Sequence, residues 1–299
     1  MLKFNEVTPK DKDRLRPMLL AEKDRGCEYT FGNIIIWNSI YATKVAYMNG
    51  SAIIRHDKHG IGYLFPVGEY DLQTAVRSML EDAERENDRF RIFAADRHDF
   101  KRLDEAFPGM FVFKEERDYS EYVYLSEHLR ELKGKRYHQK RNHISRFLQH
   151  NPDYGFSVIT PDNIARVREM NDEWCSRYGC EFNESLDEEQ CATKMAFDNF
   201  TELDFDGGFI ESEGKVLAYS MGEQINADVY CVHIEKAFHE IQGSYAIINR
   251  EFARRFCAGH TYINREDDVG EEGLRKAKLS YNPDHLTDKI TISLKNDEQ

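Results

Sequence analysis

Residues 230–253 read YCVHIEKAFHEIQGSYAIINREFA, and this stretch decides the predicted fold. The alternation from Tyr230 to Glu235 is typical of a strand, and the polar run ending at Gly243 is typical of a tight loop. The apolar spacing after Gly243 predicts a helix. Such a helix aims unpaired N–H groups and the positive end of its dipole at one place, which favours an anionic group on a ligand. The alternative is an ordinary strand-to-helix connection, because a single glycine is a weak signal.

Composition indicates a globular protein with an acidic balance. The chain has 299 residues, enough for two domains, and its 40% hydrophobic content argues against disorder. The net charge of −13 argues against general coating of nucleic acid. The longest uncharged run, residues 29–43, is too short and too polar to span a bilayer, and the N-terminus lacks a signal-peptide pattern. We therefore expect a cytoplasmic protein that is not an integral membrane protein.

The cysteines suggest neither a disulfide framework nor a metal site. Six are scattered without a Cys-x-x-Cys pair, and no histidine near Cys175 and Cys180 completes a zinc-type spacing. We expect reduced thiols, no metal and no tightly bound cofactor.

Helices and strands alternate along the whole chain, which predicts a mixed α/β fold. A first series ends near residue 125, and a second begins after the basic segment that follows. The predicted domains are 1–125 and 126–299. The second series runs strand, two helices, three strands, loop and helix, strand, helix, strand. This order resembles the GNAT acyltransferase fold, in which the strands before and after the loop and helix diverge to admit an acyl donor. The first half has a similar mix, so we expect two tandem GNAT-like domains.

Residues 128–150 carry seven basic side chains against the single acid Glu131. An apolar stripe predicts a helix here, broken at Gly134. A solvated charged face is the ordinary interpretation. In an acidic protein, the contrast favours binding of phosphates, with charged tRNA through residues 130–146 as one candidate partner.

Three stretches together resemble the family named for the C-terminal domain of phosphatidylglycerol lysyltransferase. They are GKRYHQKRN (134–142), QGSYAIINREF (242–252) and YINREDDVGEEGLRKAK (262–278). The resemblance spans nearly the whole chain. It implies a tandem acyltransferase fold and transfer of an aminoacyl group from aminoacyl-tRNA to an amine or hydroxyl, on a small molecule or a lipid headgroup.

Two departures from related patterns narrow this expectation. The membrane lysyltransferases carry a transmembrane half that this chain lacks, which makes a lipid acceptor doubtful. The coenzyme A loop of ordinary acetyltransferases reads Gln/Arg-x-x-Gly-x-Gly/Ala, whereas this chain has Glu240 first and Tyr245 last. An acid would repel a pyrophosphate and a tyrosine would crowd it, so acyl-coenzyme A is the less favoured co-substrate.

Acyl transfer requires a proton acceptor for the attacking group, a polarised carbonyl and a positioned donor. Glu235 is the first candidate for general base, and strand alternation places His233 on its face, with Cys231 beside them. The alternative for Glu235 is an ion pair with Lys236 or Arg265. Asp267 and Asp268 follow a predicted strand, so either could bind an acceptor amine or cap the next helix.

Further candidates surround these acids. Tyr281 could act as general acid on the leaving group. Arg275 and Lys278 could neutralise a phosphate or an oxyanion, or compensate a helix dipole. The predicted donor-binding residues are His233, Gln242, Gly243, Ser244, Tyr245, Lys140, Arg141, Arg265, Arg275 and Lys278.

Three functions remain open from the sequence. The first is aminoacyl transfer from charged tRNA. The second is acyl-coenzyme A-dependent N-acyl transfer. The third, from a different class, is a module that binds a phosphorylated ligand or RNA without catalysis.

Overall fold

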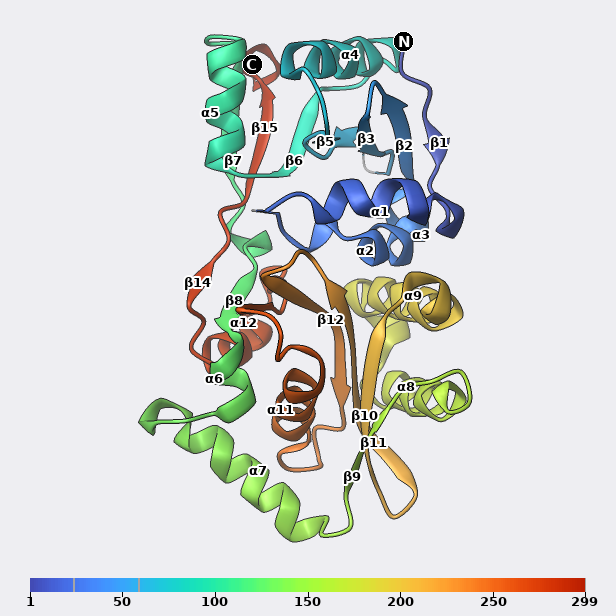
Figure 1. Ribbon diagram of the computed structural model, residues 1–299, viewed down its shortest axis with the longest axis vertical. Helices are drawn as coiled ribbons and strands as arrows, with labels where there is room; N and C mark the ends of the chain where they lie inside the picture. The colour runs from blue at the N-terminus through green and yellow to red at the C-terminus, as the bar shows by residue number, and fades with distance from the viewer. Residues whose placement is uncertain (24, 59, 299) are drawn as a thin grey trace.

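A computed structural model describes residues 1–23, 25–58 and 60–298, and within them the strands form two mixed sheets (Figure 1). The chain thus has the predicted mixed α/β fold. The first sheet has the order β1-β2-β3-β4-β6-β15-β7, with β5 paired to β3. Its strands are β1 (Asn5–Glu6), β2 (Thr43–Met48), β3 (Ser51–His56), β4 (Gly62–Tyr63), β5 (Val67–Gly68), β6 (Arg91–Ala95), β7 (Phe111–Glu115) and β15 (Ile290–Leu294).

The second sheet has the order β14-β8-β13-β12-β11-β10-β9. Its strands are β8 (Tyr122–Leu125), β9 (Gly155–Val158), β10 (Asp206–Ser212), β11 (Lys215–Gln224), β12 (Val229–Ala237), β13 (Tyr262–Asn264) and β14 (His285–Leu286). Adjacent strands in this sheet run antiparallel, except β12 and β13, which run parallel. This parallel pair is the one that the strand, loop and helix of residues 230–253 predicted.

Sheet membership departs from the predicted boundary at residue 125. β8 lies before that boundary but belongs to the second sheet, and β15 lies far after it but pairs with β6 and β7 of the first. The chain therefore leaves the first sheet after β7 and returns to it with its last strand (Figure 1). Strand patterns locate these segments without specifying partners, because a strand's alternation fixes which face is buried and not which neighbour it pairs with.

Helices cover both sheets. Around the first sheet lie α1 (Lys12–Leu20), α2 (Phe31–Ile36), α3 (Asn38–Tyr41), α4 (Leu72–Arg85) and α5 (Arg97–Ala106). Around the second lie α6 (Ser126–Glu131), α7 (His138–His150), α8 (Ile164–Tyr178), α9 (Glu184–Asp198), α10 (Phe200–Leu203), α11 (Ser244–Phe256) and α12 (Glu272–Leu279). α11 packs on one face of the second sheet, and α8 and α9 lie on the other (Figure 1). The basic segment is helical on both sides of Gly134, whose φ of 88° breaks it as predicted.

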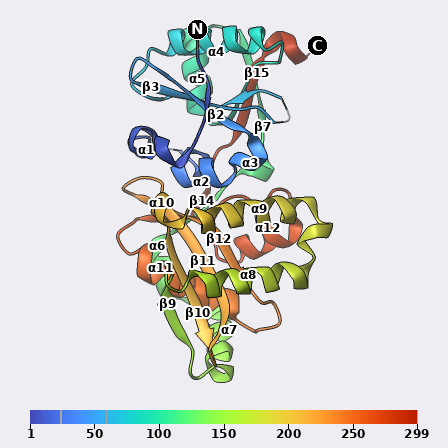
Figure 2. The same ribbon diagram turned by 90° about the vertical axis from the view of Figure 1, so that its right-hand side faces the viewer.

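The two sheets are joined by packing of α2 and α3 on α9 (Figure 2). One hydrophobic cluster runs through this junction and contains Ile35 from α2, Phe197 from α9 and Phe205 before β10. Burial of such side chains stabilises each by about 1.5–3 kcal/mol relative to exposure. The junction is therefore a packed interface, and it places Thr30 Oγ1, at the start of α2, 3.5 Å from His233 Nε2 of β12.

One sequence expectation is wrong in this region. Cys175 and Cys180 form a disulfide, with their Cα atoms 5.1 Å apart, whereas all six thiols were expected to be reduced. Gly179 adopts a left-handed conformation (φ 69°) that ends α8 and turns the chain back on it. This turn brings the two cysteines within bonding distance. No helix of the described residues is long and apolar enough to cross a membrane.

Candidate active site

The site begins where β12 and β13 diverge. The two strands pair only from Val229 to Cys231, opposite Tyr262 to Asn264. β12 continues to Ala237 without β13 beside it. The two strands therefore diverge after Cys231 and Asn264, as the element order led us to expect of this pair.

A β-bulge on β12 sits at the divergence. Met221 of β11 pairs with Ile234 and Gly222 pairs with Val232, so His233 has no partner residue on β11. A Cβ at Gly222 would lie 2.1 Å from the carbonyl oxygen of Cys231, which explains the glycine. Bulges change the direction of side chains along a strand.

The bulge corrects one prediction. Val232 packs with Tyr124 and Phe252, whereas Ile234 packs in the cluster that contains Phe197. Residues two apart would share a face in a regular strand. His233 and Glu235 therefore do not share the predicted face, and their side chains have different partners.

A cavity of about 1110 Å³ opens beside this stretch. It is lined from the second sheet's side by side chains of β12, of α7, of the start of α11 and of the segment after β13. From the first sheet's side it is lined by α2, α3 and β6. Cavities of this size accommodate drug-sized ligands.

Glu235 and Arg265 form an ion pair in the cavity wall. Arg265 Nη2 donates to Glu235 Oε1 over 2.7 Å, and Asn249 Nδ2 of α11 donates to Glu235 Oε2 over 3.1 Å. The alternative of an ion pair with Arg265 is thus realised, whereas Lys236 pairs with Glu189 instead. Arg265 Nη1 is buried and has no partner among the described residues. A buried N–H without a partner is costly, so this donor is available to a ligand oxygen.

Lys140 of α7 and Tyr281 lie next to this pair. Lys140 Nζ is 3.6 Å from the centre of the Tyr281 ring, and the Arg265 guanidinium lies 4.8 Å from the same centre. Burial, reinforced by Arg265, lowers the pKa of Lys140 to about 8. Burial also raises the pKa of Tyr281 above its usual range, which weakens it as the predicted general acid.

Asp267 and Lys278 complete the charged wall. Burial and the neighbouring Glu266 carboxylate raise the pKa of Asp267 to about 6. Lys278 Nζ donates to the carbonyl oxygens of Arg265, at 2.6 Å, and of Asp267. Burial lowers the pKa of Lys278. Lys278 therefore holds the backbone of the segment that carries both Arg265 and Asp267.

The start of α11 forms another part of the wall, through Gly243, Ser244 and Tyr245. Gly243 has a φ of 86°, and a Cβ there would lie 2.2 Å from the carbonyl oxygen of His143 in α7. The glycine thus allows α7 to pack directly against the loop. This contact brings Lys140 to the cavity.

Two residues of the loop differ from a coenzyme A cradle in ways that the structure specifies. Glu240 pairs with Arg177 and accepts a hydrogen bond from Tyr178, so its charge is compensated. Tyr245 packs near His239, with ring centres 5.4 Å apart. The repulsion expected from Glu240 is thus reduced by its ion pair, whereas the crowding of a pyrophosphate by Tyr245 stays a prediction.

Three predicted donor-binding residues lie outside the cavity lining. Gln242 is exposed on the loop. Arg141 donates to the carbonyl oxygens of Leu132 and Gly134 at 2.6 and 2.7 Å, which supports the end of α6. Arg275 pairs with Asp268 and Asp118 on the opposite side of α12. The basic residues were assigned from charge alone, which does not show which way a helix faces.

The first sheet supplies a wall that the sequence did not predict. Rings of Trp37, Tyr41, His56 and Phe93 follow one another with centres 5.8, 4.9 and 4.5 Å apart, and all four line the cavity. Burial lowers the pKa of His56 to about 4, so this row of four rings, the aromatic ladder, is uncharged at neutral pH. Trp37 and Tyr41 lie four residues apart around α3, whereas His56 comes from β3 and Phe93 from β6, and no local spacing links these last two to the first pair.

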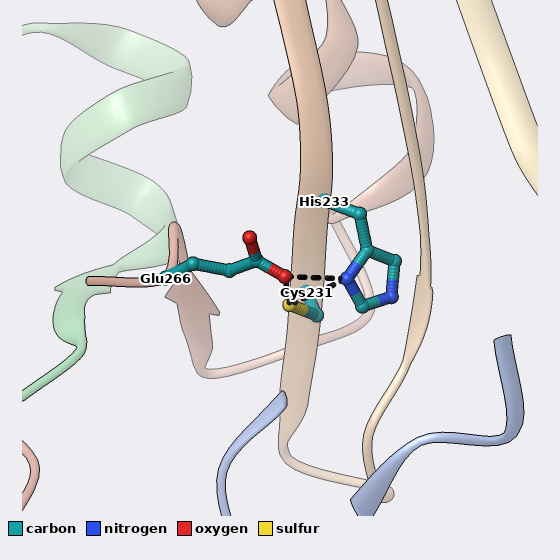
Figure 3. Close-up of side chains that lie close together, drawn as sticks. All are labelled: Cys231, His233 and Glu266. Atoms are coloured by element: carbon teal, nitrogen blue, oxygen red, sulfur yellow. Dashed lines mark hydrogen bonds and ion pairs between the residues drawn. The ribbon is translucent and has the colours of Figure 1, made fainter. Parts of the chain in front are cut away.

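His233 forms a separate cluster with Cys231 and Glu266 (Figure 3). His233 Nδ1 lies 2.7 Å from Glu266 Oε1 and 3.5 Å from Cys231 Sγ. His233 Nε2 lies 3.2 Å from Glu223 Oε1. His233 and Glu266 line the cavity, while Cys231 is buried behind them.

A mixed α/β fold with a cavity where two strands of a sheet diverge agrees with an acyltransferase-type protein. Residues 21–292 match the family described as "Phosphatidylglycerol lysyltransferase, C-terminal", and the chain belongs to this family. No match was found among curated proteins.

Solved structures agree with this assignment. A conserved protein of unknown function from Bacteroides thetaiotaomicron is 37% identical, with a TM-score of 0.95 over 99% of this chain and 100% of that one. The C-terminal domain of a putative lysylphosphatidylglycerol synthetase from Agrobacterium fabrum is 13% identical (TM-score 0.70; 95% and 91% covered). L-PGS from Bacillus licheniformis is 15% identical (TM-score 0.61; 92% and 94% covered). At these identities the last two show the shared fold.

Proposed function

We propose that this protein transfers an aminoacyl group from aminoacyl-tRNA to an amine or hydroxyl acceptor. The observation that carries the proposal is the buried, unpartnered Nη1 of Arg265 in the cavity at the diverging strands. A preorganised donor in a site shielded from water is what an oxyanion needs during acyl transfer. The family's description and the name of the putative lysylphosphatidylglycerol synthetase from Agrobacterium fabrum support lysyl or another aminoacyl group as the one transferred.

The proposed reaction assigns a role to each charged group. Asp267 accepts the proton of the acceptor amine or hydroxyl as that group attacks the ester carbonyl carbon. Its raised pKa suits a proton acceptor near neutral pH. Arg265 Nη1 stabilises the oxyanion, and Glu235 with Asn249 holds Arg265 in place. The ester C–O bond then breaks, and the ribose oxygen of tRNA leaves with the proton that Asp267 accepted, which restores the carboxylate.

We propose Asp267, rather than the first sequence candidate Glu235, as the base. Both oxygens of Glu235 already accept hydrogen bonds, from Arg265 and Asn249. The Asp267 carboxylate lines the cavity, and Val269 N–H donates to its Oδ1 over 3.1 Å. Lys140, charged below pH 8, provides a cation for the donor.

Contact with tRNA is proposed for the exposed face of α6 and α7. A pocket of about 590 Å³ is lined there by Lys135, Arg136, His138, Gln139 and Arg141. Lys133 and Arg146 are exposed on the same segment. Phosphate contacts of this kind supply affinity that falls as salt rises.

The first test is a transfer assay with tRNAs charged with labelled amino acids and a panel of amine and hydroxyl acceptors. We expect labelled acceptor to form only when charged tRNA is the donor. In the second arm, acyl-coenzyme A compounds replace charged tRNA as the donor. Their binding is also measured by thermal shift, because ligand binding raises the melting temperature. Transfer from acyl-coenzyme A, with none from any charged tRNA, would replace the proposal with the alternative function.

The second test separates tRNA binding from chemistry. Reversal of Lys133, Lys135 and Arg146 to Glu should weaken affinity for charged tRNA by about tenfold or more and flatten its salt dependence. The matched control reverses the exposed Lys3, Lys101 and Lys215, which gives the same change of net charge elsewhere. Equal affinities of the two triple variants would contradict a specific role for the segment. Arg141 is left intact because its substitution would destabilise α6.

A further inference from the structure

The cluster in Figure 3 contains three different metal-ligating side chains, and the proposed transfer reaction uses none of them. Cys231 and His233 come from β12, and Glu266 follows β13 two residues after its end. Their ligand atoms lie within 4.8 Å of one another. A thiolate, an imidazole and a carboxylate together form a donor set typical of zinc.

Two local irregularities turn these side chains toward one point. His233 is the bulged residue of β12, without a partner on β11. Glu266 adopts a left-handed backbone conformation with a φ of 56°, and Asn264 Oδ1 accepts a hydrogen bond from its N–H. A non-glycine residue in this conformation is uncommon and points to a constraint imposed by its surroundings.

We propose that Cys231, His233 and Glu266 bind a zinc-type divalent cation, contrary to the sequence expectation of no metal. In a tetrahedral zinc site with metal–sulfur bonds of about 2.3 Å and metal–nitrogen or metal–oxygen bonds of about 2.1 Å, ligand atoms are about 3.3–3.6 Å apart. Here, Sγ to Nδ1 is 3.5 Å, Sγ to Oε1 is 4.0 Å and Nδ1 to Oε1 is 2.7 Å. A small movement of Glu266, whose side chain is 21% exposed, brings the set to that geometry.

A second carboxylate orients the histidine. Glu223 Oε1 lies 3.2 Å from His233 Nε2 and accepts a hydrogen bond from Gly32 N–H over 2.8 Å. This contact directs Nδ1 toward Cys231 and Glu266. A carboxylate on the non-ligating nitrogen is the usual partner of a metal-bound histidine. Glu223 is therefore proposed as a positioning residue.

Three protein ligands leave a fourth position for water or a ligand, as in catalytic rather than structural zinc sites. Because His233 and Glu266 line the cavity, that position faces the cavity. A second cluster of possible ligands differs, because a lysine already neutralises its carboxylates. Cys27, Glu28 and Glu121 also lie close together, but there Lys289 Nζ pairs with both carboxylates. No metal is proposed at that group.

The test measures Zn²⁺ affinity of the full chain by competition with a chelating dye. We expect one Zn²⁺ per chain with a Kd on the order of 1 µM or tighter. Cys231→Ser and Glu266→Gln should each weaken binding by about 100-fold, and Glu223→Gln by about 10- to 100-fold. The control is Cys257→Ser, which changes another buried thiol and should bind as the unaltered chain does.

Cobalt provides a second, independent readout. Co²⁺ bound to the unaltered chain should give a thiolate-to-metal charge-transfer band that disappears in Cys231→Ser. If Cys231→Ser does not fold, Glu266→Gln decides, because its side chain keeps its size and reaches solvent. Absent binding, or equal Zn²⁺ affinity in Glu266→Gln and the unaltered chain, overturns the proposal. These readouts need neither donor nor acceptor, so they are independent of the proposed transfer reaction.

Discussion

The segment that follows β13 has two faces with opposite electrostatics, and two adjacent aspartates mark them. Asp267 lines the cavity, where burial and Glu266 raise its pKa to about 6. Although burial opposes it, hydrogen bonds from Arg275 and Tyr122 lower the pKa of Asp268 well below its usual range. Neighbouring carboxylates with pKa values shifted apart indicate different tasks. Asp267 is therefore placed where it could take part in chemistry, whereas Asp268 holds the loop.

The outer face is a closed ion-pair network. Asp268 accepts hydrogen bonds from Arg275 at 2.8 and 2.9 Å, from Tyr122 at 2.5 Å and from the N–H of Gly270 at 3.0 Å. Arg275 also pairs with Asp118. The sequence expectation that one of these aspartates caps the next helix is not met, because α12 has Glu271 at its N-cap and Asp268 accepts from the N–H of Gly270 before the helix. A catalytic role for Asp267 stays a prediction.

The largest expected effect comes from Asp267→Asn. Loss of the proposed proton acceptor should lower the transfer rate by about 10²- to 10⁴-fold at pH 7, measured with labelled charged tRNA. The rate of the unaltered chain should rise between pH 5 and pH 7 as Asp267 loses its proton. A variant with full activity and the same pH profile would remove Asp267 from the chemistry.

The same substitution, Asp267→Asn, should lower the transfer rate but raise the stability of the folded chain. Because the folded state raises the pKa of Asp267, ionisation costs stability as pH rises through about 6. Asn stays neutral. At pH 8, the free energy of unfolding of Asp267→Asn should therefore exceed that of the unaltered chain by about 1–2 kcal/mol, which is measured as a higher melting temperature. At pH 4 the two chains should differ little.

The next effect concerns the outer face. Asp268→Asn leaves Arg275 and Tyr122 without their anionic partner, so the free energy of unfolding should fall by about 2–3 kcal/mol at pH 7. The lowered pKa means that this stabilisation is present above the unfolded pKa of about 4 and is lost as pH falls further. Urea unfolding at pH 7 and pH 3 measures it. The exposed Asp162→Asn is the control, and equal stability of the two variants would contradict the network.

The fold could be predicted largely because its signals are local. Strand alternation, the turn at Gly243 and helix spacing located β12 and α11 within a few residues. Local signals cannot show which strand β15 joins, since a pairing partner lies far along the chain. Sequence resemblance supplied the family, which the comparisons confirm.

The site could be predicted only in part, for physical reasons visible in single residues. Glu235, Asp267, Lys140 and Tyr281 do line one cavity. The bulge at His233 follows from Gly222 on a neighbouring strand, so alternation along β12 alone gives the wrong face. The stacked rings of Trp37 and Tyr41 around α3 continue through packing to His56 of β3 and Phe93 of β6, and no linear pattern contains all four.

The smallest expected effect compares two basic residues on the two faces. Burial and Arg265 lower the pKa of Lys140 to about 8, so its charge is present at pH 7 and lost by pH 9. Affinity for a charged tRNA carrying an amide-linked amino acid, which does not hydrolyse, should fall about three- to tenfold over this range. Lys140→Gln should show the lower affinity at both pH values. Arg275→Gln, on the outer face, should bind as the unaltered chain does, because Asp268 and Asp118 already occupy Arg275. Equal losses in both variants would show that overall charge, and not the cavity face, governs donor binding.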